Sequence, residues 1–202
     1  MAVFCTDLQN FAECITDSVK MRFYSKVGKT PQNSAFFRSL KGEIMSIRVL
    51  FVCHGNICRS TLAESLFTYM VKQRGIENLF YINSAATSRE EIGNGPHYGT
   101  VRKLQEMGIP VVPHRAVQMT KEDYKKYDYL IGMDTANIRN MNRIAGGDPE
   151  NKIYKMLSFA GSGLDVADPW YTGDFDATYK DVLAGCEGFL EYLVSEGKIK
   201  ID

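Results

Sequence analysis

The residues best suited to covalent chemistry in this sequence are a cysteine and an arginine that lie six positions apart. Cys53 follows an apolar run, and Arg59 precedes a segment with helical periodicity. The loop that joins them, with the residue after it, comprises Cys53, His54, Gly55, Asn56, Ile57, Cys58, Arg59 and Ser60. The C-x5-R spacing alone is a weak signal, but its place between a strand and a helix makes it informative.

A loop of this length between a strand end and a helix N-terminus can curl until its backbone N–H groups converge on one point. The helix dipole reinforces such an anion nest, and a tetrahedral phosphate fits it. Gly55 permits close approach of the backbone, and Asn56 tolerates the left-handed conformation that a tight ring demands. Arg59 adds a planar clamp for two phosphate oxygens. We therefore expect the loop from His54 to Ser60 to bind phosphate.

The same positive environment favours the thiolate form of Cys53 over the thiol. A permanent nucleophile then faces the bound phosphorus. The competing interpretation is that Cys53 is a small buried apolar residue ending a strand, as free cysteines commonly are. The glycine, asparagine and arginine around it favour the nucleophile.

The leaving phenolate or alkoxide needs a proton, which a thiolate cannot supply, so a carboxylic acid must reach the bridging oxygen. Two Asp-Pro dipeptides compete for this role. Asp148 lies in a glycine-containing segment that reads as an ordinary surface turn. Asp168 instead precedes Trp170 and Tyr171, which suit an aryl phosphate because its ring can lie between aromatic walls. We therefore expect Asp168 to be the acid; the alternative is that the two aromatic residues anchor the loop on the core.

The elements around these residues alternate between strand and helix. Thr61 and Glu64 form a capping-box pattern ahead of a helix that stops near Gly75. Strands are expected at 47–52, 79–84, 129–131 and 153–156, and helices at 61–75, 100–107, 135–144 and 175–194. This βαβ series predicts an α/β fold with a doubly wound parallel sheet and helices on both faces. Ligands bind such sheets beyond the carboxyl ends of the strands, which is where the Cys53 loop lies.

Residues 1–45 differ from the domain that we expect over residues 46–202. Apolar residues from Leu8 to Phe23 recur at helical spacing behind a possible Thr6/Gln9 capping box, and residues 28–34 resemble a linker. The predicted amphipathic helix could pack on the main domain, bind a partner or lie outside the functional unit.

The composition excludes several classes of protein. The 24 basic and 24 acidic side chains give no net charge, which disfavours binding to nucleic acid. No apolar stretch is long enough to cross a membrane, and acidic residues near the start argue against a signal peptide, so we expect a cytoplasmic protein. The 5 cysteines do not suggest a disulfide framework. No metal-binding motif is present, and we expect no cofactor and full activity in chelator.

Residues 49–60 resemble the active-site signature of the low-molecular-weight protein tyrosine phosphatases. Further matches to family patterns lie at 84–88, 114–116, 133–134 and 168–171, so the resemblance covers about residues 46–197. It implies a flavodoxin-like four-stranded sheet and a two-step, metal-free hydrolysis through a phosphocysteine. Carried over residue by residue, it makes Cys53 the nucleophile, Arg59 the phosphate clamp, and Asp168 the general acid and then base. The expected substrate is phosphotyrosine in a protein or a small aryl phosphate.

Two further residues take their roles from context. In the family pattern the histidine matching His114 hydrogen-bonds the residues matching Ser60 and Asn56 and so supports the loop. His97 has no such match, and we expect it at a helix start on the surface. Oxidation of a thiolate can be trapped by a neighbouring thiol, so a reversible Cys53–Cys58 disulfide is one hypothesis. The other is that Cys58 is a small residue that faces the core.

The sequence departs from the family pattern at His54, Thr61 and Glu90, where an aliphatic residue, a proline and an aromatic residue are common. An acidic wall at Glu90 would disfavour strongly acidic peptides. A related subgroup that acts on phosphoarginine has threonine at the position of Ile57, and isoleucine favours the aryl ester. Arsenate reductase needs further cysteines that are missing downstream. A non-catalytic phosphotyrosine-binding or thiol redox-sensing protein remains an alternative, and we expect a monomer or weak homodimer.

Overall fold

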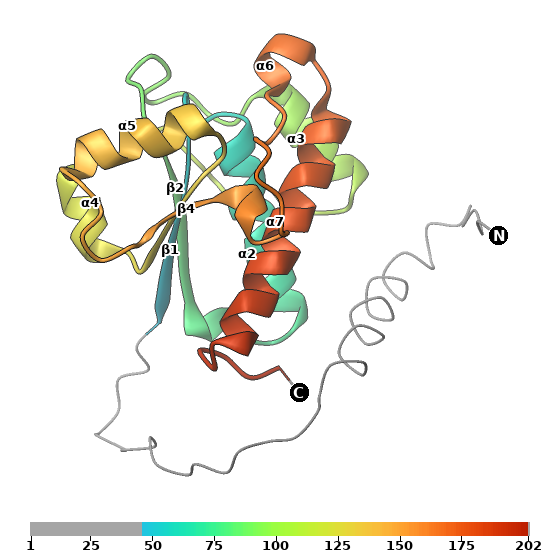
Figure 1. The fold of residues 1–202 in the computed structure, drawn as a ribbon. Helices are drawn as coiled ribbons and strands as arrows, with labels where there is room; N and C mark the ends of the chain where they lie inside the picture. Colours follow the sequence, from blue (N-terminus) through green and yellow to red (C-terminus); the bar gives the residue numbers. More distant parts are fainter. Residues whose placement is uncertain (1–45, 202) are drawn as a thin grey trace, which may run out of the picture. The chain divides into compact units, whose positions relative to one another are not determined.

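The described part of the chain is built on four parallel strands. The computed structural model describes residues 46–201, which all belong to one compact unit. The strands are β1 (Ile47–Cys53), β2 (Phe80–Ala86), β3 (Tyr129–Gly132) and β4 (Ile153–Lys155), and they lie in the order β2-β1-β3-β4. The predicted parallel sheet is therefore confirmed (Figure 1).

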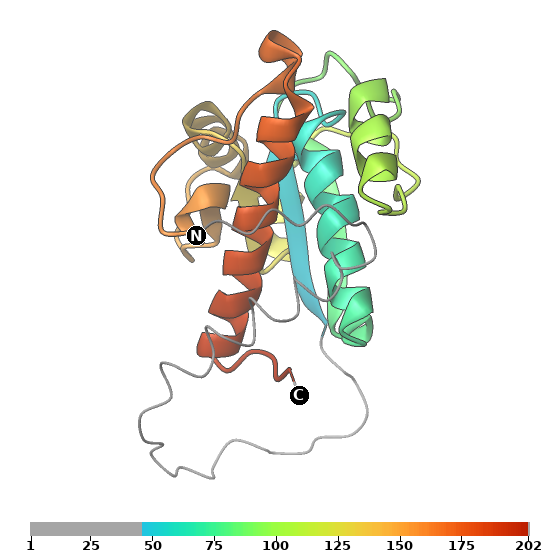
Figure 2. The same cartoon turned by 90° about the vertical axis from the view of Figure 1, so that its right-hand side faces the viewer.

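Helices cover both faces of this sheet (Figures 1 and 2). They are α2 (Arg59–Gln73), α3 (Tyr98–Glu106), α4 (Lys121–Lys126), α5 (Thr135–Ala145), α6 (Pro169–Thr172) and α7 (Phe175–Ser195). Successive residues of β1 point to opposite faces, as in any strand. Val49 and Phe51 pack in one core with α2, α3 and α7, whereas Leu50 and Val52 pack in a second core with α4 and α5. Burial on both faces explains why β1 is almost continuously apolar.

The end of β1 lies where the order of the strands reverses. β1 is followed in the chain by β2 on one side, and the chain then crosses to β3 on the other side. The loops after β1 and β3 diverge there and leave a crevice at the carboxyl end of the sheet. This is the position that the sequence predicted for the Cys53 loop.

The structure corrects several local predictions. Helix α2 begins at Arg59 with Cys58 as its N-cap and no side-chain cap, so the Thr61/Glu64 capping box is wrong. Glu64 is buried and its carboxylate is used elsewhere. The short helices α4 and α6 had not been predicted. The helix and linker predicted within residues 1–45 lie outside the described residues, so the proposed division at residue 45 stays a prediction.

Among residues 46–201, no helix combines the length and apolar character needed to span a bilayer.

Candidate active site

The loop after β1 brings the predicted cysteine and arginine into one pocket. Cys53 is the last residue of β1, and Arg59 is the first residue of α2. The pocket is lined by Cys53, His54, Gly55, Ile57, Cys58, Arg59, Glu90, Glu91, Asp168, Trp170 and Tyr171. Of the predicted phosphate-binding residues, only Asn56 and Ser60 lie outside the lining, and both are fully buried behind it.

The Cys53 sulfur lies within hydrogen-bonding distance of two donor groups. Its Sγ atom is 3.0 Å from the hydroxyl of Ser60 and accepts a hydrogen bond of 3.2 Å from the backbone N–H of Asn56. Donors directed at sulfur stabilise the negative charge of a thiolate. Ser60 thus supports the nucleophile as well as the loop.

Asn56 holds the loop in its curled form. Its φ of 59° lies in the left-handed region, as the sequence predicted. Its side-chain amide donates to Ser60 Oγ at 2.9 Å and to Ser84 Oγ at 2.8 Å. Its Oδ1 accepts from the Val117 backbone N–H at 3.1 Å and lies 2.9 Å from His114 Nε2. Four hydrogen bonds at a fully buried side chain fix the conformation of the loop.

His114 supports the loop through Asn56. The Val117 N–H donates to Asn56 Oδ1, which identifies that atom as the amide oxygen. An amide oxygen can only accept, so Nε2 of His114, 2.9 Å away, is the donor and carries a proton. The expected contact with Asn56 is therefore present, whereas Ser60 is reached through the Asn56 amide.

Glu64 completes this network, and sequence reasoning had missed it. Its Oε2 accepts a hydrogen bond of 2.6 Å from Ser84 and lies 3.4 Å from His114 Nδ1. The residues of α2 from Arg59 to Phe67 are all buried, so a carboxylate among them needs polar partners. Sequence reasoning could have found Glu64 because it is an acidic residue on the apolar part of the helix. Its position three residues after Thr61 made it resemble the second residue of a capping box instead.

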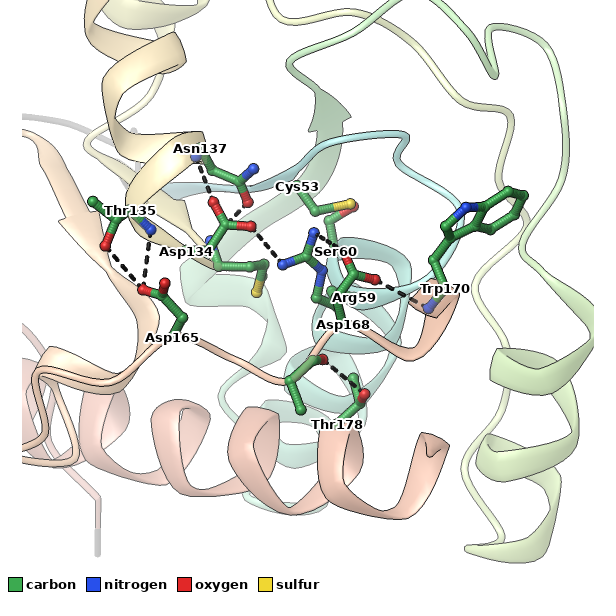
Figure 3. A network of polar contacts seen from close by, with 12 residues as sticks. Cys53, Arg59, Ser60, Asp134, Thr135, Asn137, Asp165, Asp168, Trp170 and Thr178 are labelled. Atoms are coloured by element: carbon green, nitrogen blue, oxygen red, sulfur yellow. Dashed lines mark hydrogen bonds and ion pairs between the residues drawn. The ribbon is translucent and has the colours of Figure 1, made fainter. Parts of the chain in front are cut away.

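Arg59 is held between two carboxylates (Figure 3). Its Nη1 lies 2.6 Å from Asp134 Oδ2, and its Nη2 lies 2.6 Å from Asp168 Oδ2. Burial by itself lowers the pKa of the guanidinium, but the negative charges of Cys53, Asp168 and Asp134 raise it above its ordinary value. Arg59 is 3% exposed and therefore remains a buried, fixed cation.

Asp134 is a second residue that sequence reasoning had not assigned to the site. It is the N-cap of α5, and its Oδ1 accepts from the Asn137 backbone N–H at 2.5 Å. The other carboxylate oxygen faces Arg59, so one side chain caps a helix and orients the guanidinium. Its place two residues after the end of strand β3 could have indicated this, because strand ends converge at the crevice.

Asp168 begins the short helix α6 beside Arg59 (Figure 3). Its Oδ1 accepts from the Trp170 backbone N–H at 3.1 Å, and Pro169 occupies the first position of the helix. Ala167, just before it, donates its N–H to Asp181 and accepts from Thr178 Oγ1, both at 2.9 Å. Helix α7 thus fixes the approach to Asp168.

One part of the pocket rim is aromatic and another part is charged. Trp170 is 60% exposed and Tyr171 is 84% exposed, which argues against an anchor on the core and leaves most of each ring accessible to a ligand. Elsewhere on the rim, His54 Nε2 lies 2.9 Å from Glu90 Oε2. Glu91 also lines the pocket, so two carboxylates stand at its mouth.

The remaining loop cysteine is buried and protonated. Burial, followed by the nearby charges of Cys53 and Asp168, raises the pKa of the Cys58 thiol to about 12. The three cysteines of the described region, Cys53, Cys58 and Cys186, are all free thiols. Within residues 46–201, no group of histidine, cysteine, aspartate or glutamate side chains could hold a metal ion.

Comparisons with known proteins identify relatives over the described region. The family model described as low molecular weight phosphotyrosine protein phosphatase matches residues 48–199. The low molecular weight protein-tyrosine-phosphatase YfkJ of Bacillus subtilis is 36% identical over 155 residues, which span 76% of this chain and 99% of that protein. A low molecular weight phosphotyrosine protein phosphatase of Gallus gallus is 39% identical over 155 residues, or 74% of this chain and 96% of its own.

Solved structures show the same fold. The crystal structure of YfkJ superimposes with a TM-score of 0.72 at 38% identity and covers 75% of this chain and 96% of its own. A structure described as a drosophila arginine phosphatase superimposes with a TM-score of 0.66 at 28% identity and covers 72% of this chain and 97% of its own.

Proposed function

The chain belongs to the low molecular weight phosphotyrosine protein phosphatase family, and from that membership we propose how its own residues act. It is a protein tyrosine phosphatase that removes phosphate from phosphotyrosine. One observation carries the mechanism. The Cys53 thiol, the Arg59 guanidinium and the Asp168 carboxyl line one pocket, with Asp168 paired to Arg59.

In the first step, the Cys53 thiolate attacks the phosphorus of the bound phosphomonoester. A sulfur–phosphorus bond forms as the phosphorus–oxygen bond breaks, and protonated Asp168 gives its proton to the departing phenolate. The products are a phosphocysteine and the free tyrosine hydroxyl. Ser60 and the Asn56 N–H support the sulfur charge before attack.

In the second step, Asp168 acts as the base. Its carboxylate takes a proton from water while the water oxygen attacks phosphorus, which releases inorganic phosphate and restores the thiolate. The acid is thus regenerated with each turnover. Arg59 binds the equatorial phosphate oxygens in both steps, and Asp134 keeps the guanidinium directed at them.

The aromatic rim supports an aryl ester as the substrate. A phosphotyrosine ring between Trp170 and Tyr171 would cover apolar surface that is now exposed. The buried Ile57 contributes to the same pocket. The likeness to an arginine phosphatase makes phosphoarginine the comparison substrate, which we expect to be hydrolysed less efficiently than phosphotyrosine.

The proposal also covers the cellular compartment and the oligomeric state of the protein. Free thiols at Cys53, Cys58 and Cys186 suit a reducing compartment, so we place the protein in the cytoplasm. We expect it to act as a monomer or weak homodimer through a catalytic domain that spans residues 46–202.

Replacement of the nucleophile tests the mechanism. The variant Cys53→Ser should lose turnover of phosphotyrosine and of small aryl phosphates while still binding inorganic phosphate. A covalent phosphoenzyme trapped by rapid acid quench should form in the wild type and be missing in the variant. Glu191→Gln, which changes an exposed carboxylate of α7 outside the pocket, should leave turnover unchanged. Normal turnover in Cys53→Ser would falsify the nucleophile assignment.

A further inference from the structure

Sequence reasoning had placed His97 on the surface at a helix start, but its ring is half-buried between segments of the active site. We propose that His97 is a positioning residue for proton transfer, because it fixes the segment that carries Asp168 and Trp170 against the phosphate-binding loop. The proposal rests on Asp168 acting as the general acid. His97 itself does not line the pocket, so it acts through the residues that it contacts.

His97 is fixed to the phosphate-binding loop by its backbone. Its N–H donates a hydrogen bond of 2.7 Å to the carbonyl of Ile57, in the middle of the loop. Its ring is also fixed, because Nδ1 accepts a hydrogen bond of 3.1 Å from the Gly99 N–H as the N-cap of α3. The ring therefore has a defined position relative to the loop.

The same ring contacts both ends of the segment that carries the acid. It stacks on Phe175, the first residue of α7, with the ring centres 5.4 Å apart and the planes 8° apart. It meets Trp170 edge to face at 6.2 Å. In Figure 3 the Trp170 indole projects away from Asp134, on the side of the site where α3 lies. Trp170 is two residues after Asp168, so the ring links the loop to the acid.

The packing at this contact leaves no free space. A Cβ atom placed on Gly99 would lie 2.3 Å from the Phe175 ring, so the first turn of α3 touches that ring directly. Movement of Phe175 toward α3 is therefore blocked. Rotation of the His97 ring would break its hydrogen bond to Gly99.

The acid segment is short and is held at both of its sides. Helix α6 has only four residues, and Trp170 and Tyr171 are both exposed. The contacts of Ala167 with Asp181 and Thr178 hold the side before Asp168. On the side after it, Phe175 packs with Ile57, Cys58 and Ala116, and the His97 ring contacts both Phe175 and Trp170. Without the ring, Trp170 would lose its contact with α3, and the Asp168 carboxyl, which the Trp170 N–H binds, would be positioned less precisely at the bridging oxygen. Small displacements of a reacting group cost large factors in rate.

Leaving-group dependence separates this role from a structural one. A dinitrophenolate leaves without a proton, whereas the phenolate of phenyl phosphate needs one. The ratio kcat/KM reports the steps through phosphorus–oxygen bond cleavage. We expect His97→Ala to lower kcat/KM for phenyl phosphate by about tenfold, with less than about a twofold change for a dinitrophenyl phosphate and for inhibition by inorganic phosphate.

Two further variants separate the effect of the His97 ring contacts from the effect of its hydrogen bond to α3. His97→Phe keeps an aromatic ring and loses the acceptor for Gly99, and it should restore most of the activity on phenyl phosphate. His97→Asn keeps an acceptor that can cap α3 and loses the ring. It should resemble His97→Ala. Tyr98→Ala removes the exposed ring next to His97. Within residues 46–201 the Tyr98 ring pairs with His97 and not with Trp170 or Phe175, so this variant should keep the leaving-group dependence of the wild type.

All variants are compared in the full chain, and Asp168→Asn is included. Equal losses on the two substrates in His97→Ala, or wild-type behaviour of His97→Asn, would overturn the role of His97. If Asp168→Asn shows strong leaving-group dependence and His97→Ala shows none, only the His97 inference fails. If Asp168→Asn itself shows no such dependence, the assignment of the acid in the proposed function fails.

Discussion

Asp168 and Arg59 form an ion pair in which the proposed acid occupies one arm of the proposed phosphate clamp, with Oδ2 2.6 Å from Nη2. Asp134 occupies the other arm. A phosphate oxygen that binds Nη2 therefore meets the Asp168 carboxylate at the same nitrogen, which places the carboxyl next to the incoming ester. The Asp168 carboxylate and the bound anion therefore compete for the charge of the same guanidinium.

The first prediction follows from that competition. Asp168→Asn removes a negative charge from the anion site, and we expect inorganic phosphate to inhibit or bind about fivefold more tightly, or roughly 1 kcal/mol for a partly screened repulsion. Turnover should fall by roughly 10² to 10⁴ at the same time, the usual worth of a positioned proton donor. Isothermal titration with phosphate and steady-state assays measure the two effects. Weaker phosphate binding by the variant would contradict the competition.

The sequence could predict the part of the site that is built locally. The strand, loop and helix from Ile47 to Gln73 are contiguous, and their residue types alone indicate the anion nest. The left-handed conformation of Asn56 follows from the same local pattern. The sequence also singled out Asp168, Trp170 and Tyr171, which line the pocket, since an Asp-Pro dipeptide beside aromatic residues is visible in the sequence.

The missed residues are those whose role depends on distant partners. Glu64 accepts from Ser84, on a different strand, and Asp134 meets Arg59 across the crevice between strand ends. Each also fits a local pattern for a helix cap, and for Asp134 that pattern is real. His97 was assigned to the surface because it has no match in the family pattern, and its ring partners Phe175 and Trp170 come from a segment more than seventy positions away. Tertiary packing decides such roles, and no spacing in the sequence encodes it.

The second prediction concerns the buried network behind the loop. Glu64→Ala leaves the Ser84 hydroxyl and His114 Nδ1 without their acceptor in a buried region. We expect a loss of about 1–3 kcal/mol in the free energy of unfolding, measured by urea denaturation. The kcat on aryl phosphates should also fall, because Ser84 and His114, which hold the Asn56 side chain, are themselves held by Glu64. Glu191→Ala, at an exposed position of α7, serves as the control, and equal stability of the two variants would exclude a supporting role for Glu64.

The third prediction concerns peroxide. Peroxide converts the Cys53 thiolate to a sulfenic acid, and attack by Cys58 sulfur would form a disulfide and release water. The pKa of about 12 at Cys58 means that its thiolate is scarce at neutral pH and rises about tenfold per pH unit. Part of that elevation comes from the Cys53 charge, which the oxidation removes. Recovery of activity with a dithiol reductant should therefore be present in the wild type and increase with the pH of the peroxide treatment.

A matched pair of variants tests this assignment. Cys58→Ser should recover less activity, because the unprotected sulfenic acid proceeds to irreversible oxidation. The double variant Cys5→Ser/Cys14→Ser should recover like the wild type. If Cys58→Ser recovers fully, Cys58 acts only as a small buried residue.

The last prediction concerns the acidic rim. Glu90 pairs with His54, yet both side chains are more than half exposed, and Glu91 lines the same pocket. A peptide that carries acidic residues beside its phosphotyrosine brings like charges to this rim, whereas lysine or arginine there is attracted. We expect kcat/KM to be higher for basic-flanked than for acidic-flanked phosphotyrosine peptides, and the difference to shrink as salt is added.

Charge removal at the rim provides the direct measurement. Glu90→Gln should raise kcat/KM for acidic-flanked peptides by about two- to fivefold at low ionic strength, the size of one exposed charge interaction. It should leave small aryl phosphates unaffected, because these do not extend beyond the rim. Glu122→Gln, on α4, removes the same charge away from the pocket and controls for net charge. An equal effect of both variants would assign the preference to the overall charge of the protein, whereas an effect of Glu90→Gln alone locates it at the pocket mouth.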